Sequence, residues 1–214
     1  MIRAVLFDLD GTLADTAPDL AYALNTLRGA RGMPPLPLDV TRPVASQGAR
    51  GLIGVGFGVA PGDPGYDALR DRFLTVYEAN LCRLTTLFPG MPEVLAALEE
   101  RGMPWGVVTN KLERFTHPLL DALKLSARAA CVVGGDTTLY SKPHPAPLLA
   151  ASRMIDIPPE ACLYVGDDRR DVEAGHAAGM KAAVAGWGYL NGNDSETWAA
   201  DWMLGHPEEL IRII

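Results

Sequence analysis

The sequence predicts an α/β fold in which a parallel sheet carries helices on both faces and a helical segment is inserted near the start. Three observations support this. Short apolar runs alternate with amphipathic helical patterns over most of the 214 residues, an order typical of parallel sheets. Residues 16–85 break the alternation because they hold helical patterns only. The hydrophobic fraction of 48% is enough for one large core, or for a core with a smaller insertion.

The first predicted strand is the apolar run RAVLFD at residues 3–8, and four further runs each follow a helical pattern. These runs are PWGVVTN at 104–110, AACVVGGD at 129–136, ACLYVGDD at 161–168 and KAAVAGWG at 181–188. The tail ADWMLGHPEELIRII, from residue 200, predicts a short edge strand and a closing helix. Together these segments predict a sheet whose strands are joined by crossover helices.

The insertion contains at least two helices. They are DLAYALNTLRGA at 19–30 and YDALRDRFLTVYEANLC at 66–82, and Thr16 followed by Pro18 is a typical helix start. We interpret the glycine-rich GVGFG at 54–58 as a loop, because it follows no strand and lacks dinucleotide-binding spacing. The predicted domains are a core of residues 1–15 and 86–214 and a helical cap of residues 16–85.

Composition excludes several classes of protein. A net charge of −7 and a pI near 5.1 argue against a nucleic-acid partner, which usually meets a basic surface. No apolar run approaches the roughly 20 residues that cross a bilayer, and no signal peptide is recognised. The three cysteines show neither a disulfide nor a zinc pattern. We therefore expect a cytoplasmic protein without a membrane partner.

Polar residues cluster where the predicted strands end, which in parallel sheets is the edge where ligands bind. Taken singly, each has a plainer explanation: Asp-Gly is a common turn, and a lone lysine is usually a solvated surface charge. Their appearance together at one sheet edge favours a functional site. The residues are Asp8 and Asp10, Thr109 and Asn110, Lys142 in the loop SKPHP, and Asp167 and Asp168.

These segments resemble the four motifs of haloacid dehalogenase-superfamily phosphatases. DLDGT at 8–12 is similar to the first motif, VVTN at 107–110 to the second, SKP at 141–143 to the third and GDDRRD at 166–171 to the fourth. The chain most resembles the phosphoglycolate phosphatase-like group. RGMPPL, SQGAR and PWGVVTNK also resemble N-acetylmuramic acid 6-phosphate phosphatases. Asp168 and His144 depart from the common pattern, in which a small or neutral residue and an aspartate often stand.

The resemblance implies a Rossmann-like sheet with an inserted cap and a Mg²⁺-dependent phosphatase. It implies that Asp8 is the nucleophile, which forms an aspartyl-phosphate, and that Asp10 is the acid and base. Mg²⁺ would be held by Asp8, Asp167 and the main-chain carbonyl of Asp10. Thr109 and Asn110 would donate hydrogen bonds to the phosphoryl oxygens.

The resemblance gives two further residues a place near the phosphate. Lys142 would balance the clustered carboxylates and bind the phosphoryl group. Asp171 would orient Lys142 or reach the metal through water; alternatively, it is an acid stabilised by a helix N-terminus.

Substrate choice should reside in the cap, because the core motifs recognise only the phosphoryl group. Arg50 in SQGARG can hold a carboxylate through paired hydrogen bonds; alternatively, it is a solvated helix residue. The expected substrate is a small phosphorylated metabolite, phosphoglycolate or N-acetylmuramate 6-phosphate, and the protein is a monomer or homodimer. A sugar-phosphate mutase is a nearer rival than a dehalogenase, and a non-enzymatic binding protein on the same scaffold is a further alternative. Asp10 argues against a dehalogenase, because that group lacks this acid.

Overall fold

The computed structural model describes residues 1–190 and 195–214, and it contains a six-stranded sheet flanked by helices. All neighbouring strands of this sheet pair in parallel, which confirms the predicted α/β class. The strand order is β5 (Cys131–Val133), β4 (Trp105–Val108), β1 (Ala4–Phe7), β6 (Cys162–Gly166), β7 (Lys181–Ala185) and β8 (Trp202–Leu204).

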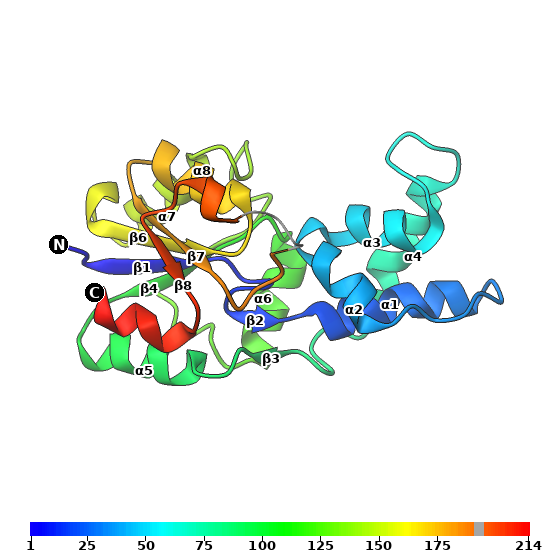
Figure 1. Ribbon diagram of the computed structural model, residues 1–214, viewed down its shortest axis with the longest axis horizontal. Helices are drawn as coiled ribbons and strands as arrows, with labels where there is room; N and C mark the ends of the chain where they lie inside the picture. Colours follow the sequence, from blue (N-terminus) through cyan, green and yellow to red (C-terminus); the bar gives the residue numbers. More distant parts are fainter. Residues whose placement is uncertain (191–194) are drawn as a thin grey trace.

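Helices cover both faces of the sheet because the side chains of a strand alternate between its faces. In β1, Ala4 and Leu6 pack in a buried cluster with α7 (Ala146–Met154) and α8 (Arg169–Ala177). Val5 and Phe7 pack in the other cluster, with residues of α5 (Met91–Glu100) and α6 (Glu113–Ala122). Figure 1 shows α5 below the sheet and α7 and α8 above it.

The tail contains β8 as an edge strand and the 3₁₀ helix η4 (Pro207–Arg212) beside α5 (Figure 1). Two further 3₁₀ turns lie in the core, η2 (Pro159–Ala161) and η3 (Ser195–Trp198). The expected closing helix is therefore present in 3₁₀ form, and Leu210 packs it into the main core cluster.

The chain leaves the sheet after β1 and forms a separate group of helices before it returns. The antiparallel pair β2 (Ala14–Asp15) and β3 (Thr86–Leu87) marks the exit and the return. Between them the helices lie together on the right of Figure 1, and we call this segment the cap. They are α1 (Ala17–Gly29), α2 (Leu38–Thr41), the 3₁₀ helix η1 (Arg42–Gln47), α3 (Gly48–Phe57) and α4 (Tyr66–Glu78).

The interpretation of residues 54–58 as a loop is wrong, because residues 54–57 form the end of α3. Gly56 is buried against α1, and a Cβ there would lie 2.5 Å from a methyl carbon of Leu24. The main-chain carbonyl of Gly56 also accepts a hydrogen bond from the buried Arg28 of α1. Gly56 therefore serves close helix packing in the cap.

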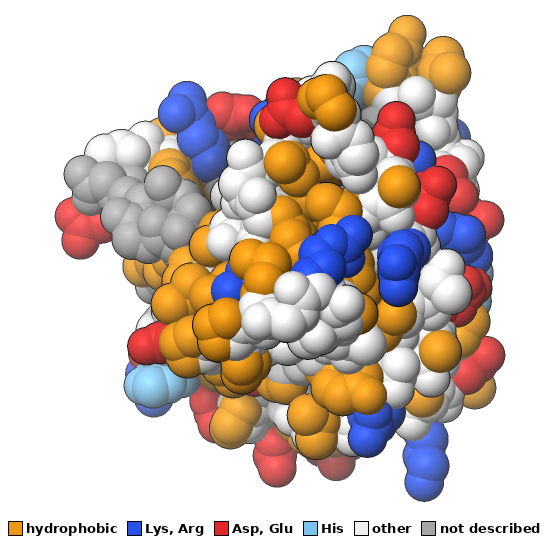
Figure 2. Space-filling view, turned by 90° about the vertical axis from the view of Figure 1, so that its right-hand side faces the viewer, with side chains coloured by type: hydrophobic (Ala, Val, Ile, Leu, Met, Phe, Trp, Pro, Cys, Tyr) orange, Lys and Arg blue, Asp and Glu red, His pale blue; other side chains and the backbone are white. Residues whose placement is uncertain are grey.

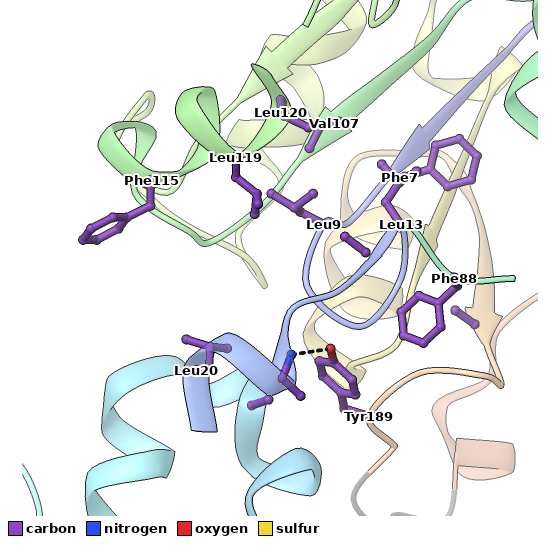
Figure 3. Packing of buried hydrophobic residues seen from close by; sticks show 14 of the residues in the cluster. Phe7, Leu9, Leu13, Leu20, Phe88, Val107, Phe115, Leu119, Leu120 and Tyr189 are labelled. Atoms are coloured by element: carbon purple, nitrogen blue, oxygen red, sulfur yellow. Dashed lines mark hydrogen bonds between the residues drawn. The ribbon is translucent and has the colours of Figure 1, made fainter. Parts of the chain in front are cut away.

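Buried polar contacts join the cap to the core at its two connections. Thr16 precedes α1 as predicted, but its hydroxyl donates to Asp10 instead of capping the helix. Asp19 of α1 accepts hydrogen bonds from the main-chain N–H groups of Leu84 and Thr85, on the returning segment. Tyr189, which follows β7, accepts a hydrogen bond from the N–H of Ala17, drawn as the dashed line in Figure 3.

The buried cluster continues from the sheet toward the cap. Phe7, Leu9 and Leu13, from β1 and the turn after it, lie near Leu119 of α6 and Phe88 in Figure 3. The outer surface of the cap carries several hydrophobic side chains among charged ones (Figure 2), including Val40 and Val55, which are about 40% exposed. Among the described residues, no helix combines the length and apolar character that crossing a membrane requires.

Candidate active site

Asp8 and Asp10 lie at the carboxyl end of β1 and both line one cavity. Leu9 between them is fully buried in the core, which turns the two carboxylates to the other side of the chain. Asp8 Oδ1 accepts a hydrogen bond of 2.8 Å from the N–H of Leu9 and forms a 3.0 Å ion pair with Lys142 Nζ. Among the described residues, Asp8 Oδ2 has no hydrogen-bond partner and is thus available for a ligand.

Lys142 reaches this carboxylate from the loop after β5 and is almost completely buried. Its three N–H groups face four acceptors, the Val108 carbonyl at 3.2 Å, the Tyr164 hydroxyl at 2.6 Å, Asp171 at 2.7 Å and Asp8 at 3.0 Å. Burial alone lowers the pKa of Lys142, but the charges of Asp171 and Asp8 outweigh burial and raise it. The ammonium group is therefore charged, fixed and fully occupied by acceptors.

Thr109 and Asn110 follow β4 and line the same cavity, but their side chains have different tasks. The Asn110 carboxamide donates to the Lys142 carbonyl at 3.0 Å and accepts from the Lys142 N–H at 2.9 Å. These two bonds position the lysine loop and use one of the two N–H groups of the carboxamide. The Thr109 hydroxyl oxygen accepts a hydrogen bond from the N–H of Lys111, and its proton remains available to a ligand.

Asp8, Asp167 and Asp171 form a buried cluster in which one oxygen of each lies within 4.8 Å of the others. Burial raises the pKa of Asp8 to about 6, and the nearby charges of Asp171 and Asp10 add to this while Lys142 opposes it. Burial and the charge of Asp8 likewise raise the pKa of Asp167 well above its usual value. A divalent cation would compensate these charges, and carboxylate oxygens are the ligands that Mg²⁺ prefers.

Asp167 is held in place by donors from three segments. Thr12 Oγ1 donates to its Oδ1 at 3.0 Å, while the Tyr189 N–H and Ser46 Oγ donate to its Oδ2 at 2.8 and 3.1 Å. A Cβ at Gly11, whose φ is +86°, would lie 2.2 Å from Asp167 Oδ2. The glycine of the first motif is thus required by both its backbone conformation and the approach of this carboxylate.

Asp10 has a partner that the sequence analysis did not single out. Lys111 Nζ lies 2.8 Å from Asp10 Oδ1 and 3.1 Å from Oδ2, and Thr16 Oγ1 donates to Oδ1 at 2.5 Å. The Lys111 side chain is only 8% exposed and its Nζ lies 4.8 Å from the centre of the Tyr77 ring. In the sequence, the one indication of a role for Lys111 was its position directly after VVTN, at the same sheet edge.

These groups face a cavity of about 300 Å³ between the core and the cap. One part of its wall is polar and formed by the motif residues, and the other is apolar. The apolar side chains come from α1, α4, the segment from η1 to α3, and α6 with the residue that precedes it: Leu20, Ala45, Ala49, Phe73, Leu74, Tyr77, Leu112 and Phe115. Such a mixed lining suits an organic group attached to a charged one.

The structure does not bring Arg50 into this cavity. Arg50 is exposed on α3, and the lining of this part of the cap ends at Ala49. The cap residues that reach the polar side are Ser46, Gln47 and Gly48, at the junction of η1 and α3. The expected carboxylate contact through Arg50 therefore has no support from the geometry.

Asp168 and Arg170 also line the cavity, where α8 begins. The Asp168 side chain caps α8 by accepting from the N–H of Arg170, and the Asp171 side chain accepts from the N–H of Asp168. These reciprocal bonds form a capping box. Asp171 thus takes part in capping α8 and also contacts Lys142 Nζ at 2.7 Å.

Comparisons with known proteins agree with this arrangement. A family model described as haloacid dehalogenase-like hydrolase matches residues 5–185. An N-acetylmuramic acid 6-phosphate phosphatase of Pseudomonas aeruginosa is 42% identical over 214 residues, covering 100% of this chain and 95% of the relative. A phosphoglycolate phosphatase of Xanthomonas campestris pv. campestris is 44% identical over 209 residues, covering 97% and 94%.

A solved structure of a predicted phosphoglycolate phosphatase from Haemophilus somnus 129PT has a TM-score of 0.87 and 27% identity. The match covers 99% of this chain and 97% of that one. The shared fold, the matching family model and relatives similar over their full length lead to one conclusion: the chain belongs to the haloacid dehalogenase-like hydrolase family.

Proposed function

We propose that the chain, a phosphoric monoester hydrolase, uses Mg²⁺ and an aspartyl-phosphate intermediate on Asp8 to hydrolyse a small phosphate monoester. The observation that carries this proposal is the buried carboxylate cluster of Asp8, Asp167 and Asp171 beside the fixed ammonium of Lys142. A phosphate monoester resists attack because its own oxygens repel an anion. This site brings a nucleophile together with groups that neutralise that charge.

Mg²⁺ fits the residues present, since the cluster offers carboxylate oxygens, and burial together with the neighbouring carboxylates raises the pKa values of Asp8 and Asp167. Asp8, Asp167 and the main-chain carbonyl of Asp10 would hold the ion, with Asp171 next to them. When bound, the ion supplies charge neutralisation at the phosphoryl oxygens. Lys142 and the Thr109 hydroxyl provide the protein's own contribution to this neutralisation. The Asn110 carboxamide fixes the loop that carries Lys142.

The reaction has two steps of displacement at phosphorus. In the first step, an Asp8 carboxylate oxygen forms a bond to phosphorus as the bond to the leaving oxygen breaks. Oδ2 is suited to this attack because it has no hydrogen-bond partner among the described residues. Asp10 gives a proton to that oxygen and the product alcohol leaves. Water then attacks phosphorus while Asp10 takes its proton, and the bond to Asp8 breaks. Thr16 and Lys111 hold the Asp10 carboxylate beside the cavity for this role.

Phosphoglycolate and N-acetylmuramate 6-phosphate are the two candidate substrates, because relatives of both names match over nearly the whole chain. A phosphoglycolate phosphatase-like activity is consistent with the motifs. One observation favours the second substrate: eight apolar or aromatic side chains line the cavity. Glycolate has a single methylene group to place against them, whereas an N-acylated sugar has a ring face and methyl groups.

The direct test is a screen for phosphate release from both candidates and from p-nitrophenyl phosphate, with Mg²⁺ and with EDTA. We expect Mg²⁺-dependent release from all three, and a clear preference in kcat/KM for one metabolite. Interconversion of hexose phosphates without release of phosphate would indicate a mutase instead. Binding without turnover in the presence of Mg²⁺ would indicate a non-enzymatic protein and contradict the proposal.

Asp10→Asn should slow hydrolysis of alkyl phosphates far more than that of p-nitrophenyl phosphate. General acid catalysis contributes roughly 10²–10⁴-fold when the leaving group needs a proton, and nitrophenolate leaves without one. Because Asp10 also serves as the base in the second step, which both substrates share, kcat/KM is compared for the two substrate types, since it reports only the formation of the aspartyl-phosphate. Equal losses with the two substrates would contradict an acid role for Asp10.

Asp167→Ala should raise the Mg²⁺ concentration needed for half-maximal activity by at least about tenfold, since a charged ligand is lost. Titration of Mg²⁺ at saturating substrate measures this shift. Asp121→Ala provides the matched control, because Asp121 is an exposed aspartate of α6. An unchanged Mg²⁺ dependence in Asp167→Ala would remove Asp167 from the metal site.

A further inference from the structure

The three cationic side chains that line the cavity differ in how far their donors are occupied. Lys142 is surrounded by four acceptors and Lys111 is paired with both oxygens of Asp10. Arg170 uses Nε and Nη2, but its Nη1 has no partner among the described residues. Because Nη1 carries two N–H groups, Arg170 keeps a pair of donors for a ligand, whereas Lys111 has one N–H beyond its two bonds to Asp10 and its Nζ lies beside the Tyr77 ring.

The Arg170 guanidinium is fixed before any ligand arrives. Nε donates to Asp168 Oδ1 and Nη2 to Asp168 Oδ2, both at 2.8 Å, in a bidentate pair. Nη2 also donates to the main-chain carbonyl of Ser46 in the cap at 3.0 Å. Asp168 itself is held as the cap of α8. A binding group held in this way loses little conformational freedom when its ligand binds.

The position of Arg170 suits the part of a substrate that lies beyond the phosphate. Asp8, Lys142 and Thr109 surround the place proposed for the phosphoryl group, while Arg170 reaches the wall where α8 meets Ser46 of the cap. Its side chain is 37% exposed, so a ligand can approach it. An arginine at such a place recognises a planar anion, above all a carboxylate.

We propose that Arg170 determines specificity by binding a carboxylate of the leaving group, and that Asp168 is the positioning residue for its guanidinium. The inference rests on the proposed function and adds a substrate class: phosphate monoesters whose alcohol carries a carboxylate. It assigns a role to Asp168, which departs from the common pattern of the fourth motif. It also places the selective arginine in the core, at the start of α8, instead of in the cap at Arg50.

Two substrate pairs that differ in the carboxylate test this assignment. N-acetylmuramate 6-phosphate is compared with N-acetylglucosamine 6-phosphate, which lacks the lactyl carboxylate, and phosphoglycolate is compared with ethyl phosphate. Arg170→Met should lower kcat/KM for the carboxylated member of the preferred pair about 10- to 100-fold, chiefly through KM, because a charge-assisted contact is lost. The loss for the other member should be much smaller. Arg170→Lys should recover part of the preference.

Matched variants separate this role from a general one. Arg169→Met removes the neighbouring arginine, which is 71% exposed and pairs with Glu173, and it should keep the preference for the carboxylate. Asp168→Asn should weaken the preference less than Arg170→Met does, because the guanidinium remains but loses its clamp. Equal losses on both members of each pair, or loss of the preference in Arg50→Met instead, would overturn the assignment.

A binding measurement keeps the inference separate from the proposed function. Calorimetry compares 3-phosphonopropionate, a non-hydrolysable analogue of phosphoglycolate, with propylphosphonate, which lacks the carboxylate. Wild-type protein should bind the first more tightly, and Arg170→Met should abolish this difference while circular dichroism shows an intact fold. Absence of phosphate release from every ester would refute the hydrolase proposal. A carboxylate preference that persists in Arg170→Met would refute the role of Arg170 alone.

Discussion

Asp8→Asn is expected to abolish turnover, with a loss of at least about 10³-fold in kcat on every phosphate monoester. The amide nitrogen and oxygen cannot form the acyl phosphate, and the remaining groups of the site only bind and polarise the ester. Phosphate release by freshly purified protein measures the loss, and mass spectrometry excludes deamidation back to aspartate. A variant that retains wild-type kcat would remove Asp8 from the role of nucleophile.

The same variant should be well folded, for a reason that lies in the charge of the site. Burial raises the pKa of Asp8 to about 6 from 3.8. Between these values the folded state binds more protons than the unfolded state, so the free energy of unfolding falls as the pH rises through this window. The neutral amide of the variant removes the free-energy cost of ionising this buried group. Lys142 loses one charged partner but keeps Asp171.

Metal-free Asp8→Asn should therefore melt no lower than metal-free wild-type protein at pH 7.5, with the advantage shrinking toward pH 4. Thermal melts in EDTA at both pH values measure this. Mg²⁺ should raise the melting temperature of the wild-type protein more than that of the variant, because at a given concentration a ligand that binds the folded state more tightly stabilises it more. A variant that melts well below the wild type at pH 7.5 would contradict the cost assigned to the buried charge.

The sheet could be predicted because its strands are buried on both faces. β1, β4 and β6 are continuous apolar runs, and each is followed by the polar residues that a parallel sheet collects at one edge. The order of the strands and the register of β1 against β6 were not predictable, since they depend on contacts between segments far apart in the chain. The motif residues lie together because those of the first, second and fourth motifs follow β1, β4 and β6 directly, and Lys142 lies in the loop after β5.

The partners of the charged residues could not be predicted from the sequence for the same reason. Lys111 and Asp10 are separated by 101 positions, and nothing near either residue indicates their ion pair. Arg170 and Asp168 are two positions apart, but the contact of Arg170 with the Ser46 carbonyl depends on where η1 ends. Gly48, with a φ of +59°, sets the turn between η1 and α3 and thereby decides which cap side chains reach the cavity.

Lys142→Met is expected to lose both activity and stability. The side chain is 3% exposed and its ammonium joins Asp8 at 3.0 Å and Asp171 at 2.7 Å. Removing one partner of a buried ion pair leaves an uncompensated charge, at a cost of about 3–5 kcal/mol in the free energy of unfolding. Turnover should fall as well, because the phosphoryl group loses a fixed cation. Urea unfolding and phosphate release measure the two effects.

Two further variants separate the loss of folding from the loss of catalysis. Lys181→Met removes an exposed lysine that pairs with Asp201, and it should change stability by less than about 1 kcal/mol. Lys142→Met combined with Asp171→Asn removes charges of both signs, so it should recover part of the lost stability. Activity should remain low in this double variant, because no cation replaces Lys142 at the phosphate. Recovery of wild-type turnover together with stability would show that Lys142 serves the fold alone.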